Sequence, residues 1–128
     1  MRKPNRVFVV DDEPLVREGI SFALRKHYRA EALPSAEAAI ESMLSNPPDM
    51  VLLDVGLPGM SGIQALEKIK QIHPGVIVIM ITAFEDVNTV AAAMKLGAYD
   101  YLVKPVKMDA LLVTMRNALD AVSKHTEA

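Results

Sequence analysis

The sequence has no cysteine, no strongly basic segment and no long hydrophobic run. The absence of cysteine among 128 residues excludes disulfides, thiolate metal sites and cysteine nucleophiles, and it suits a cytoplasmic protein. The net charge of −2, without a basic stripe, argues against direct binding of nucleic acid by this chain. The longest apolar runs, such as 76–81, are too short to span a membrane, and the basic start lacks the apolar core of a signal peptide.

The chain instead contains short apolar runs that alternate five times with helical patterns. Alternation of this kind predicts right-handed crossovers and a parallel sheet covered on both faces. We expect one flavodoxin-like α/β domain, a doubly wound (βα)5 fold with strand order 2-1-3-4-5. Its core spans about 6–122, and 123–128 form a frayed tail or the start of a linker to an output domain outside this chain. The expected strands are 7–10, 28–33 (an edge strand), 50–54, 76–82 and 99–103.

Helical spacing predicts which apolar side chains of the helices face the core. Ser35 is expected to cap the second helix at its start, and Gly97 suits the position just after the fourth. The residues expected to face inward are Ala36, Ile40, Met43 and Leu44 in the second helix, Val87, Val90, Ala91 and Met94 in the fourth, and Met108, Leu111, Leu112, Met115, Leu119 and Val122 in the fifth.

Polar residues stand at the carboxyl ends of four of the expected strands. Asp11 and Asp12 follow the first strand, Asp54 ends the third, Thr82 ends the fourth, and Lys104 follows the fifth. In open α/β sheets ligands bind at this edge, at the point where the strand order reverses. That point lies between the first and third strands, so the three aspartates are expected to meet there. Taken alone, Asp54 could merely cap the turn that follows it.

Three carboxylates in one cleft require a compensating cation. A pair ~4 Å apart repels by roughly 1 kcal/mol in water and by about 4 kcal/mol at an effective dielectric constant of 20. Lys104 is one candidate cation, and Mg²⁺, which prefers a few carboxylates, waters and a phosphate oxygen, is the other. The site therefore suggests phosphoryl transfer to Asp54 as a carboxylate nucleophile, with Lys104 and the Thr82 hydroxyl contacting the incoming group.

Two other kinds of site fit less well. A nucleotide- or flavin-binding domain would place a Ser-, Thr- or Gly-rich phosphate cradle after the first strand, whereas the acidic run 11–13 stands there and would repel phosphate without a metal. An aspartate-based phosphatase usually needs a cap domain, for which the chain has no room.

Several motifs stand around these strand ends. They are Val10-Asp11-Asp12-Glu13-Pro14, Leu53-Asp54-Val55-Gly56-Leu57-Pro58-Gly59-Met60-Ser61-Gly62, Ile81-Thr82-Ala83 and Tyr101-Leu102-Val103-Lys104-Pro105. Taken together, they make the sequence between Arg6 and Val122 resemble the response-regulator receiver domains of two-component signalling.

The resemblance implies that a sensor histidine kinase donates a phosphoryl group from its phosphohistidine to Asp54. It also implies that Asp11, Asp54 and the Gly56 carbonyl hold Mg²⁺, with Asp12 contributing mainly through water. Such a domain gains and loses its own phosphoryl group and does not turn over external substrates. The alternative is a pseudo-receiver, or a stand-alone receiver, that acts as a protein-interaction module.

The family also implies how the phosphorylated state is held and transmitted. Thr82, the Ala83 backbone N–H and Lys104 are expected to hold the phosphoryl oxygens, while Thr82 moves inward and Tyr101 rotates behind it. The surface built from the fourth helix, fifth strand and fifth helix is then expected to carry the output, through a homodimer.

Finer features bear on phosphate lifetime and on output. Gly56 and Phe84 occupy two positions that vary among resembling proteins and tune how long the phosphate lasts. The stretches 82–87 and 97–105 are most similar to receivers of transcriptional activators that carry an AAA+ ATPase, which predicts a role in transcription regulation.

Overall fold

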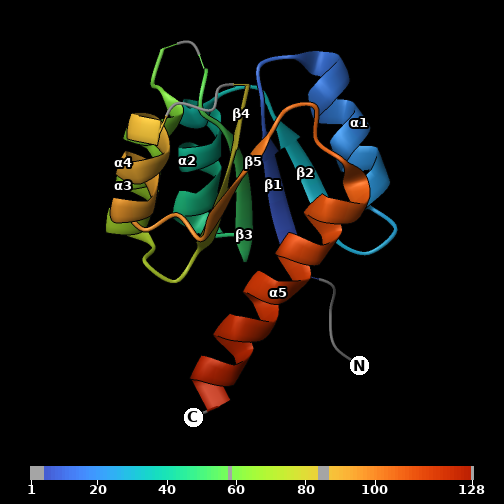
Figure 1. Ribbon diagram of the computed structural model, residues 1–128, viewed down its shortest axis with the longest axis vertical. Helices are drawn as coiled ribbons and strands as arrows, with labels where there is room; N and C mark the ends of the chain where they lie inside the picture. The colour runs from blue at the N-terminus through green and yellow to red at the C-terminus, as the bar shows by residue number, and fades with distance from the viewer. Residues whose placement is uncertain (1–4, 58, 84–86, 128) are drawn as a thin grey trace.

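In the part of the chain that the structure describes, five strands form a single parallel sheet, and five helices pack on its two faces (Figure 1). The structure is a computed structural model that describes residues 5–57, 59–83 and 87–127, with side chains as far as Val122. The elements are β1 (Arg6–Val10), α1 (Pro14–Leu24), β2 (Arg29–Leu33), α2 (Ala36–Ser45), β3 (Met50–Asp54), α3 (Gly62–Ile72), β4 (Ile77–Thr82), α4 (Val87–Lys95), β5 (Asp100–Val103) and α5 (Met108–Glu127).

The strand order is β2-β1-β3-β4-β5, and every neighbouring pair is parallel, as predicted. The predicted strand bounds agree with the structure within one residue. Every residue of β3 and β4 is buried, because helices cover both faces of these central strands, and both strands are apolar up to their last residues, Asp54 and Thr82. The partly exposed strands β2 and β5 form the two edges.

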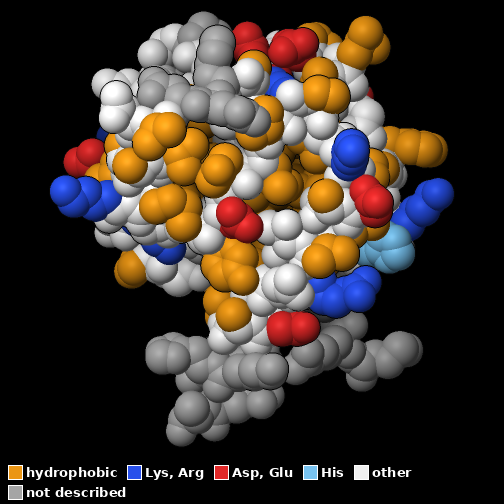
Figure 2. All heavy atoms as spheres, viewed as in Figure 1, with side chains coloured by type: hydrophobic (Ala, Val, Ile, Leu, Met, Phe, Trp, Pro, Cys, Tyr) orange, Lys and Arg blue, Asp and Glu red, His pale blue; other side chains and the backbone are white. Residues whose placement is uncertain are grey.

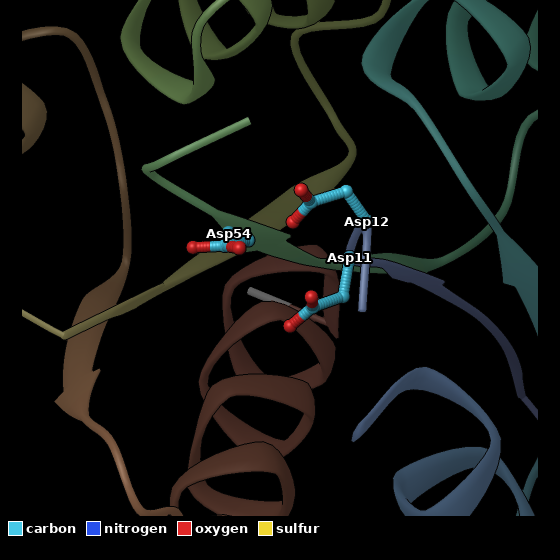
Figure 3. Close-up of side chains that lie close together, drawn as sticks. All are labelled: Asp11, Asp12 and Asp54. Atoms are coloured by element: carbon cyan, nitrogen blue, oxygen red, sulfur yellow. The ribbon is translucent and has the colours of Figure 1, made fainter. Parts of the chain in front are cut away.

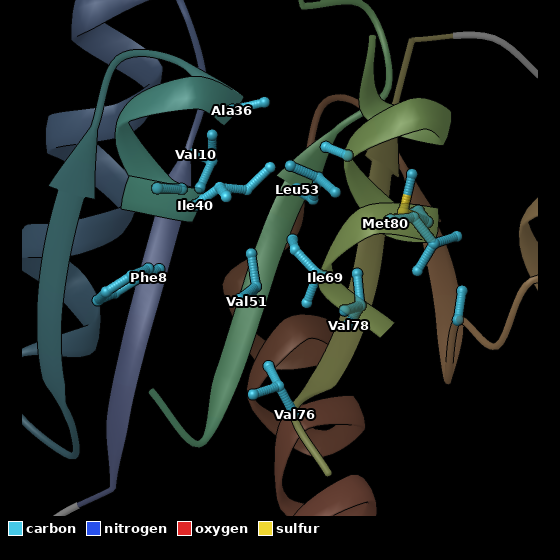
Figure 4. Packing of buried hydrophobic residues seen from close by; sticks show 14 of the residues in the cluster. Phe8, Val10, Ala36, Ile40, Val51, Leu53, Ile69, Val76, Val78 and Met80 are labelled. Atoms are coloured by element: carbon cyan, nitrogen blue, oxygen red, sulfur yellow. The ribbon is translucent and has the colours of Figure 1, made fainter. Parts of the chain in front are cut away.

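Alternate residues of the strands build two hydrophobic clusters, one on each face of the sheet. Phe8, Val51 and Val78 point to the side covered by α2, α3 and α4 (Figure 4). Val9 and Leu52, on the same strands, point instead toward α1 and α5. Burying a side chain of this size contributes roughly 1.5–3 kcal/mol, so the two clusters hold the strands in one register.

Two helices begin at serine caps. The Ser35 hydroxyl accepts a hydrogen bond from the Ala38 N–H at 3.1 Å, which confirms the predicted cap of α2. At α3, Ser61 accepts from the Gln64 N–H at 3.2 Å, and the Gln64 side chain accepts from the Ser61 N–H at 3.0 Å. This reciprocal pair satisfies two donors at the helix start and fixes where α3 begins.

The predicted inward face of α4 is wrong. Val87 is 78% exposed, and Ala91 and Met94 are exposed as well, whereas Ala93 is the buried residue of this helix. Both the row through Val87, Ala91 and Met94 and the row through Val90 and Ala93 match helical spacing, because α4 carries apolar residues on most of its circumference. Periodicity alone therefore cannot choose between the two rows.

Two further residues that helical spacing predicts as buried are not. Leu44 is 63% exposed, since its neighbour Met43 occupies the inward position of the last turn of α2. Val122 is also exposed, because α5 continues to Glu127 and its C-terminal half runs past the end of the sheet (Figure 1). The segment 123–127, expected as a frayed tail or the start of a linker, continues the backbone of α5. Within the described residues, no helix has both the length and the apolar character needed to cross a membrane.

Two glycine substitutions should change stability in opposite directions. A Cβ on Gly62 would lie 2.5 Å from the Asp54 carbonyl oxygen and 2.6 Å from the Val55 Cα, so Gly62→Ala should destabilise by about 1–3 kcal/mol. A Cβ on Gly19, inside α1, meets nothing within 4 Å, so Gly19→Ala should stabilise by about 0.5–1 kcal/mol. Urea unfolding measures both, and a stabilised Gly62→Ala protein would contradict the close approach of α3 to β3.

Candidate functional site

The candidate site lies at the carboxyl edge of the sheet, where the ends of β1 and β3 lie side by side. Val10 pairs with Leu53, so Asp11 and Asp12 leave β1 next to Asp54 at the end of β3. The carboxylates of Asp11 and Asp12 point from the end of β1 toward Asp54 (Figure 3). Each of the three offers an oxygen within 4.8 Å of the others. The structure therefore brings together the three aspartates that the sequence predicted.

Burial distinguishes the members of this acidic cluster. Asp11 is 3% and Asp54 5% exposed, whereas Asp12 is exposed to solvent. The Asp54 Oδ1 accepts a hydrogen bond from the Gly56 N–H at 3.1 Å, and the Asp11 Oδ1 accepts from the Glu13 N–H at 2.9 Å. The two buried carboxylates are thus held by backbone donors of the loops that follow their strands.

The Lys104 ammonium group lies between the buried carboxylates. Its Nζ is 3.0 Å from the Asp11 Oδ2, 3.3 Å from the Asp54 Oδ2 and 3.5 Å from the Glu13 Oε1. The Lys104 N–H donates to the Thr82 carbonyl at 2.7 Å, which ties the end of β5 to the end of β4. Lys104 is therefore the first of the two cations that the sequence suggested for this cluster.

Burial and neighbouring charges shift the pKa values of Asp54 and Lys104. Burial raises the pKa of Asp54 and the Asp11 charge adds to this, although the Gly56 hydrogen bond and Lys104 act in the opposite direction. Burial alone would lower the pKa of Lys104, but the hydrogen bond to Asp11 and the charges of Asp54 and Asp11 outweigh it and raise that pKa. Lys104 therefore stays charged, while the ionised form of Asp54 remains costly.

The remaining predicted residues occupy different places around the cluster. Thr82 is buried at the end of β4, and Ala83 follows it at the surface. Tyr101 lies on β5 and is 37% exposed, so its side chain is turned outward in this structure. Gly56 is exposed, and a Cβ there would lie 3.8 Å from the Asp54 Oδ1. Phe84 lies outside the described residues.

Comparison with known proteins decides the family. The family model described as the response regulator receiver domain matches residues 7–116. The chain is a response regulator receiver domain. A solved receiver domain protein (CheY-like) from Methanospirillum hungatei JF-1 is similar to it, with a TM-score of 0.92, 27% identity, and coverage of 96% of this chain and 99% of that chain.

Longer regulators also contain a similar domain. "Regulatory protein AtoC" of Escherichia coli (strain K12) is 34% identical over 125 residues, which are 96% of this chain and 27% of that protein. The structure of NtrX from Brucella abortus in complex with ATP has a TM-score of 0.90 and 30% identity, over 97% of this chain and 29% of NtrX. The chain therefore spans little more than a quarter of each of these two relatives.

Sequence reasoning missed two residues at the site of this receiver domain. Glu13 contributes the third contact to Lys104, and Arg17 donates a hydrogen bond from Nη1 to the Asp11 carbonyl at 2.8 Å. Glu13 carried a signal, since it continues the acidic run after β1. Arg17 carried none, because a basic residue inside an amphipathic helix ordinarily lies on the solvated face.

Asp54→Asn should stabilise the receiver domain at neutral pH in the presence of EDTA. The pKa of Asp54 is higher in the folded than in the unfolded state. The free energy of unfolding therefore falls as the pH rises from the unfolded pKa to the folded pKa, and this loss of stability, the deficit, remains at every higher pH. The amide carries no charge and avoids that deficit. We expect a gain of about 1 kcal/mol at pH 7, as measured by denaturant unfolding. The gain should shrink as the pH falls toward 4, and a pH-independent difference would contradict this account.

Proposed function

We propose that Asp54 is the phosphoacceptor of this receiver domain and that a sensor histidine kinase is the donor. An Asp54 carboxylate oxygen attacks the phosphorus of the phosphohistidine, the P–N bond breaks, and its electron pair stays on the departing imidazole. The single observation that carries this proposal is the position of Asp54, buried at the carboxyl edge and paired with Lys104 beside Asp11. The cysteine-free sequence suits an exchange in the cytoplasm.

The donor set fits Mg²⁺. Hard carboxylate oxygens within 4.8 Å of one another, two of them on buried residues, suit a small divalent cation that keeps several waters. Asp11, Asp54 and the Gly56 carbonyl would hold the ion, with Asp12 acting through water because it is the exposed member of the cluster. When bound, Mg²⁺ supplies neutralisation of the charge on the transferred phosphoryl group.

Lys104, Thr82 and the Ala83 N–H would hold the phosphoryl oxygens once the group is on Asp54. Lys104 is already 3.3 Å from the Asp54 Oδ2, so a small displacement brings its ammonium group to a phosphoryl oxygen. Thr82 ends β4, the strand next to β3, and its carbonyl accepts a hydrogen bond from the Lys104 N–H. The two ligands therefore lie at the two ends of the segment that contains α4 and β5.

The output surface is expected on α4, β5 and α5. A phosphoryl group adds about −1.5 to −2 charges and pulls Thr82 and Lys104 inward, which biases the packing of the elements between them. Val87, Met94, Tyr99 and Tyr101 leave hydrophobic side chains exposed on α4 and around β5. Figure 2 shows hydrophobic side chains gathered over this face. Inward rotation of Tyr101 would reshape it and favour a homodimer.

The whole regulator is proposed to act in transcription regulation. The relatives named above are regulatory proteins much longer than this chain, and the receiver domain spans only 27% of AtoC. An output domain outside this chain, of the AAA+ ATPase kind carried by the activators whose receivers this sequence resembles, would then respond to the state of Asp54.

Acetyl phosphate should add one phosphoryl group to the protein in the presence of Mg²⁺, because the chemistry depends on position and charge neutralisation rather than on the donor. Intact mass spectrometry measures the adduct. Asp54→Ala should remove it, whereas Asp109→Ala, at an exposed aspartate in the first turn of α5, should retain it. An adduct that persists in Asp54→Ala or without Mg²⁺ would refute the proposed acceptor, and no adduct on folded wild-type protein would favour an interaction module.

Native mass spectrometry of the same samples tests the output. Labelled protein should show more dimer than unlabelled protein at equal concentration, since only the labelled form presents the rearranged face. A labelled protein that remains fully monomeric would contradict dimerisation as the output.

A further inference from the structure

The loop from β1 to α1 carries two of the three aspartates, and its geometry is set by a residue outside the acidic cluster. Only three residues separate the end of β1 at Val10 from the start of α1 at Pro14. Glu13, the N-cap residue of α1, makes no capping hydrogen bond through its side chain within the described part of the chain. The helix start is therefore held through the loop itself, by the hydrogen bond from the Glu13 N–H to the Asp11 Oδ1 and by one further connection from the body of α1.

Arg17 supplies that connection. Its N–H donates to the Glu13 carbonyl at 2.9 Å, as the first turn of α1 requires, and its guanidinium reaches back to the Asp11 carbonyl at 2.8 Å. Arg17 is half-buried, and its own carbonyl accepts from the Ser21 hydroxyl at 2.8 Å. The guanidinium bond therefore spans the loop from α1 back to the residue after β1, while the backbone bond is the ordinary first-turn bond of the helix.

With this bond, all polar groups of Asp11 are fixed. Its N–H donates to the Leu33 carbonyl at 3.2 Å, its Oδ1 accepts from Glu13, and its Oδ2 pairs with Lys104. The Arg17 bond is the one that holds its carbonyl, which is also the carbonyl that leads into Asp12. Loss of that bond would free the peptide that leads into Asp12 and let the Asp12 carboxylate move, and it would remove one of the backbone restraints on Asp11.

We propose that Arg17 is a positioning residue that sets the Mg²⁺ affinity of the acidic cluster by holding the Asp11–Asp12 peptide. This inference rests on the proposed function, because it takes the cluster to be a Mg²⁺ site. Mutation of residues that orient metal ligands without touching the metal typically weakens metal binding by about 10- to 100-fold.

The sign of the effect separates positioning from charge. Arg17 carries a positive charge near the place of a cation, so its Coulomb contribution opposes Mg²⁺ binding. If only its charge mattered, Arg17→Met would bind Mg²⁺ more tightly than wild type. If positioning matters, Arg17→Met binds it more weakly in spite of the lost repulsion.

Isothermal titration of MgCl₂ into the whole chain measures this affinity directly. We expect Arg17→Met to raise the Kd by about 10-fold, and Arg17→Lys, which keeps the charge and a donor, to stay close to wild type. Arg25→Met is the matched control, since Arg25 is an exposed arginine just after the end of the same helix, about 12 Å further along. The Mg²⁺ concentration for half-maximal labelling by acetyl phosphate should rise by the same factor in Arg17→Met.

Each outcome has a distinct meaning. An Arg17→Met protein that binds Mg²⁺ as tightly as wild type, or more tightly, overturns the positioning role while leaving Asp54 phosphorylation untouched. A wild-type protein that binds no Mg²⁺ refutes the proposed site itself, and this inference with it. If Arg17→Met fails to fold by circular dichroism, Arg17→Gln, which keeps a shorter amide donor without the charge, should show an intermediate Kd, and a Kd equal to or below that of wild type would overturn the role.

Discussion

The contact of one ammonium group with two buried carboxylates governs this structure. Lys104 lies 3.0 Å from the Asp11 Oδ2 and 3.3 Å from the Asp54 Oδ2, where uncompensated carboxylates would repel strongly. The lysine follows β5, at one edge of the sheet, while the aspartates end the interior strands β1 and β3. The ammonium group reaches both carboxylates only when all these strands are in register. The site is therefore a consequence of the complete fold rather than of any one loop.

Packing of the apolar core fixes that register, and the charged residues of the site are not needed for it. Alternate residues of β1, β3 and β4 fill two clusters, and a slip of one residue would turn each of these side chains to the wrong face. The same register delivers Asp54 beside Asp11 and places the first turn of α3 against the Asp54 carbonyl, where only the missing side chain of Gly62 leaves room. The strand register that stabilises the fold is thus also the register that positions the residues of the site.

Much of this was predictable because strand ends carry the signal. Asp11, Asp54 and Lys104 each follow an apolar run, and parallel strands deliver such residues to one edge. The exposed row of α4 was not predictable, since its two apolar rows differ only in what packs against them. The Arg17 contact was also hidden, because a long side chain that folds back onto a loop leaves no trace in periodicity.

A double-mutant cycle on Lys104 and Asp54 tests the central claim, that one charge balance joins these residues in the metal-free fold. Denaturant unfolding in EDTA at pH 7 gives the four free energies of unfolding. We expect Lys104→Met to destabilise the protein, and Asp54→Asn to stabilise it more in the Lys104→Met background than in wild type, with a coupling of about 0.5–3 kcal/mol. Equal effects of Asp54→Asn in both backgrounds would show that the two groups act independently and would contradict the account.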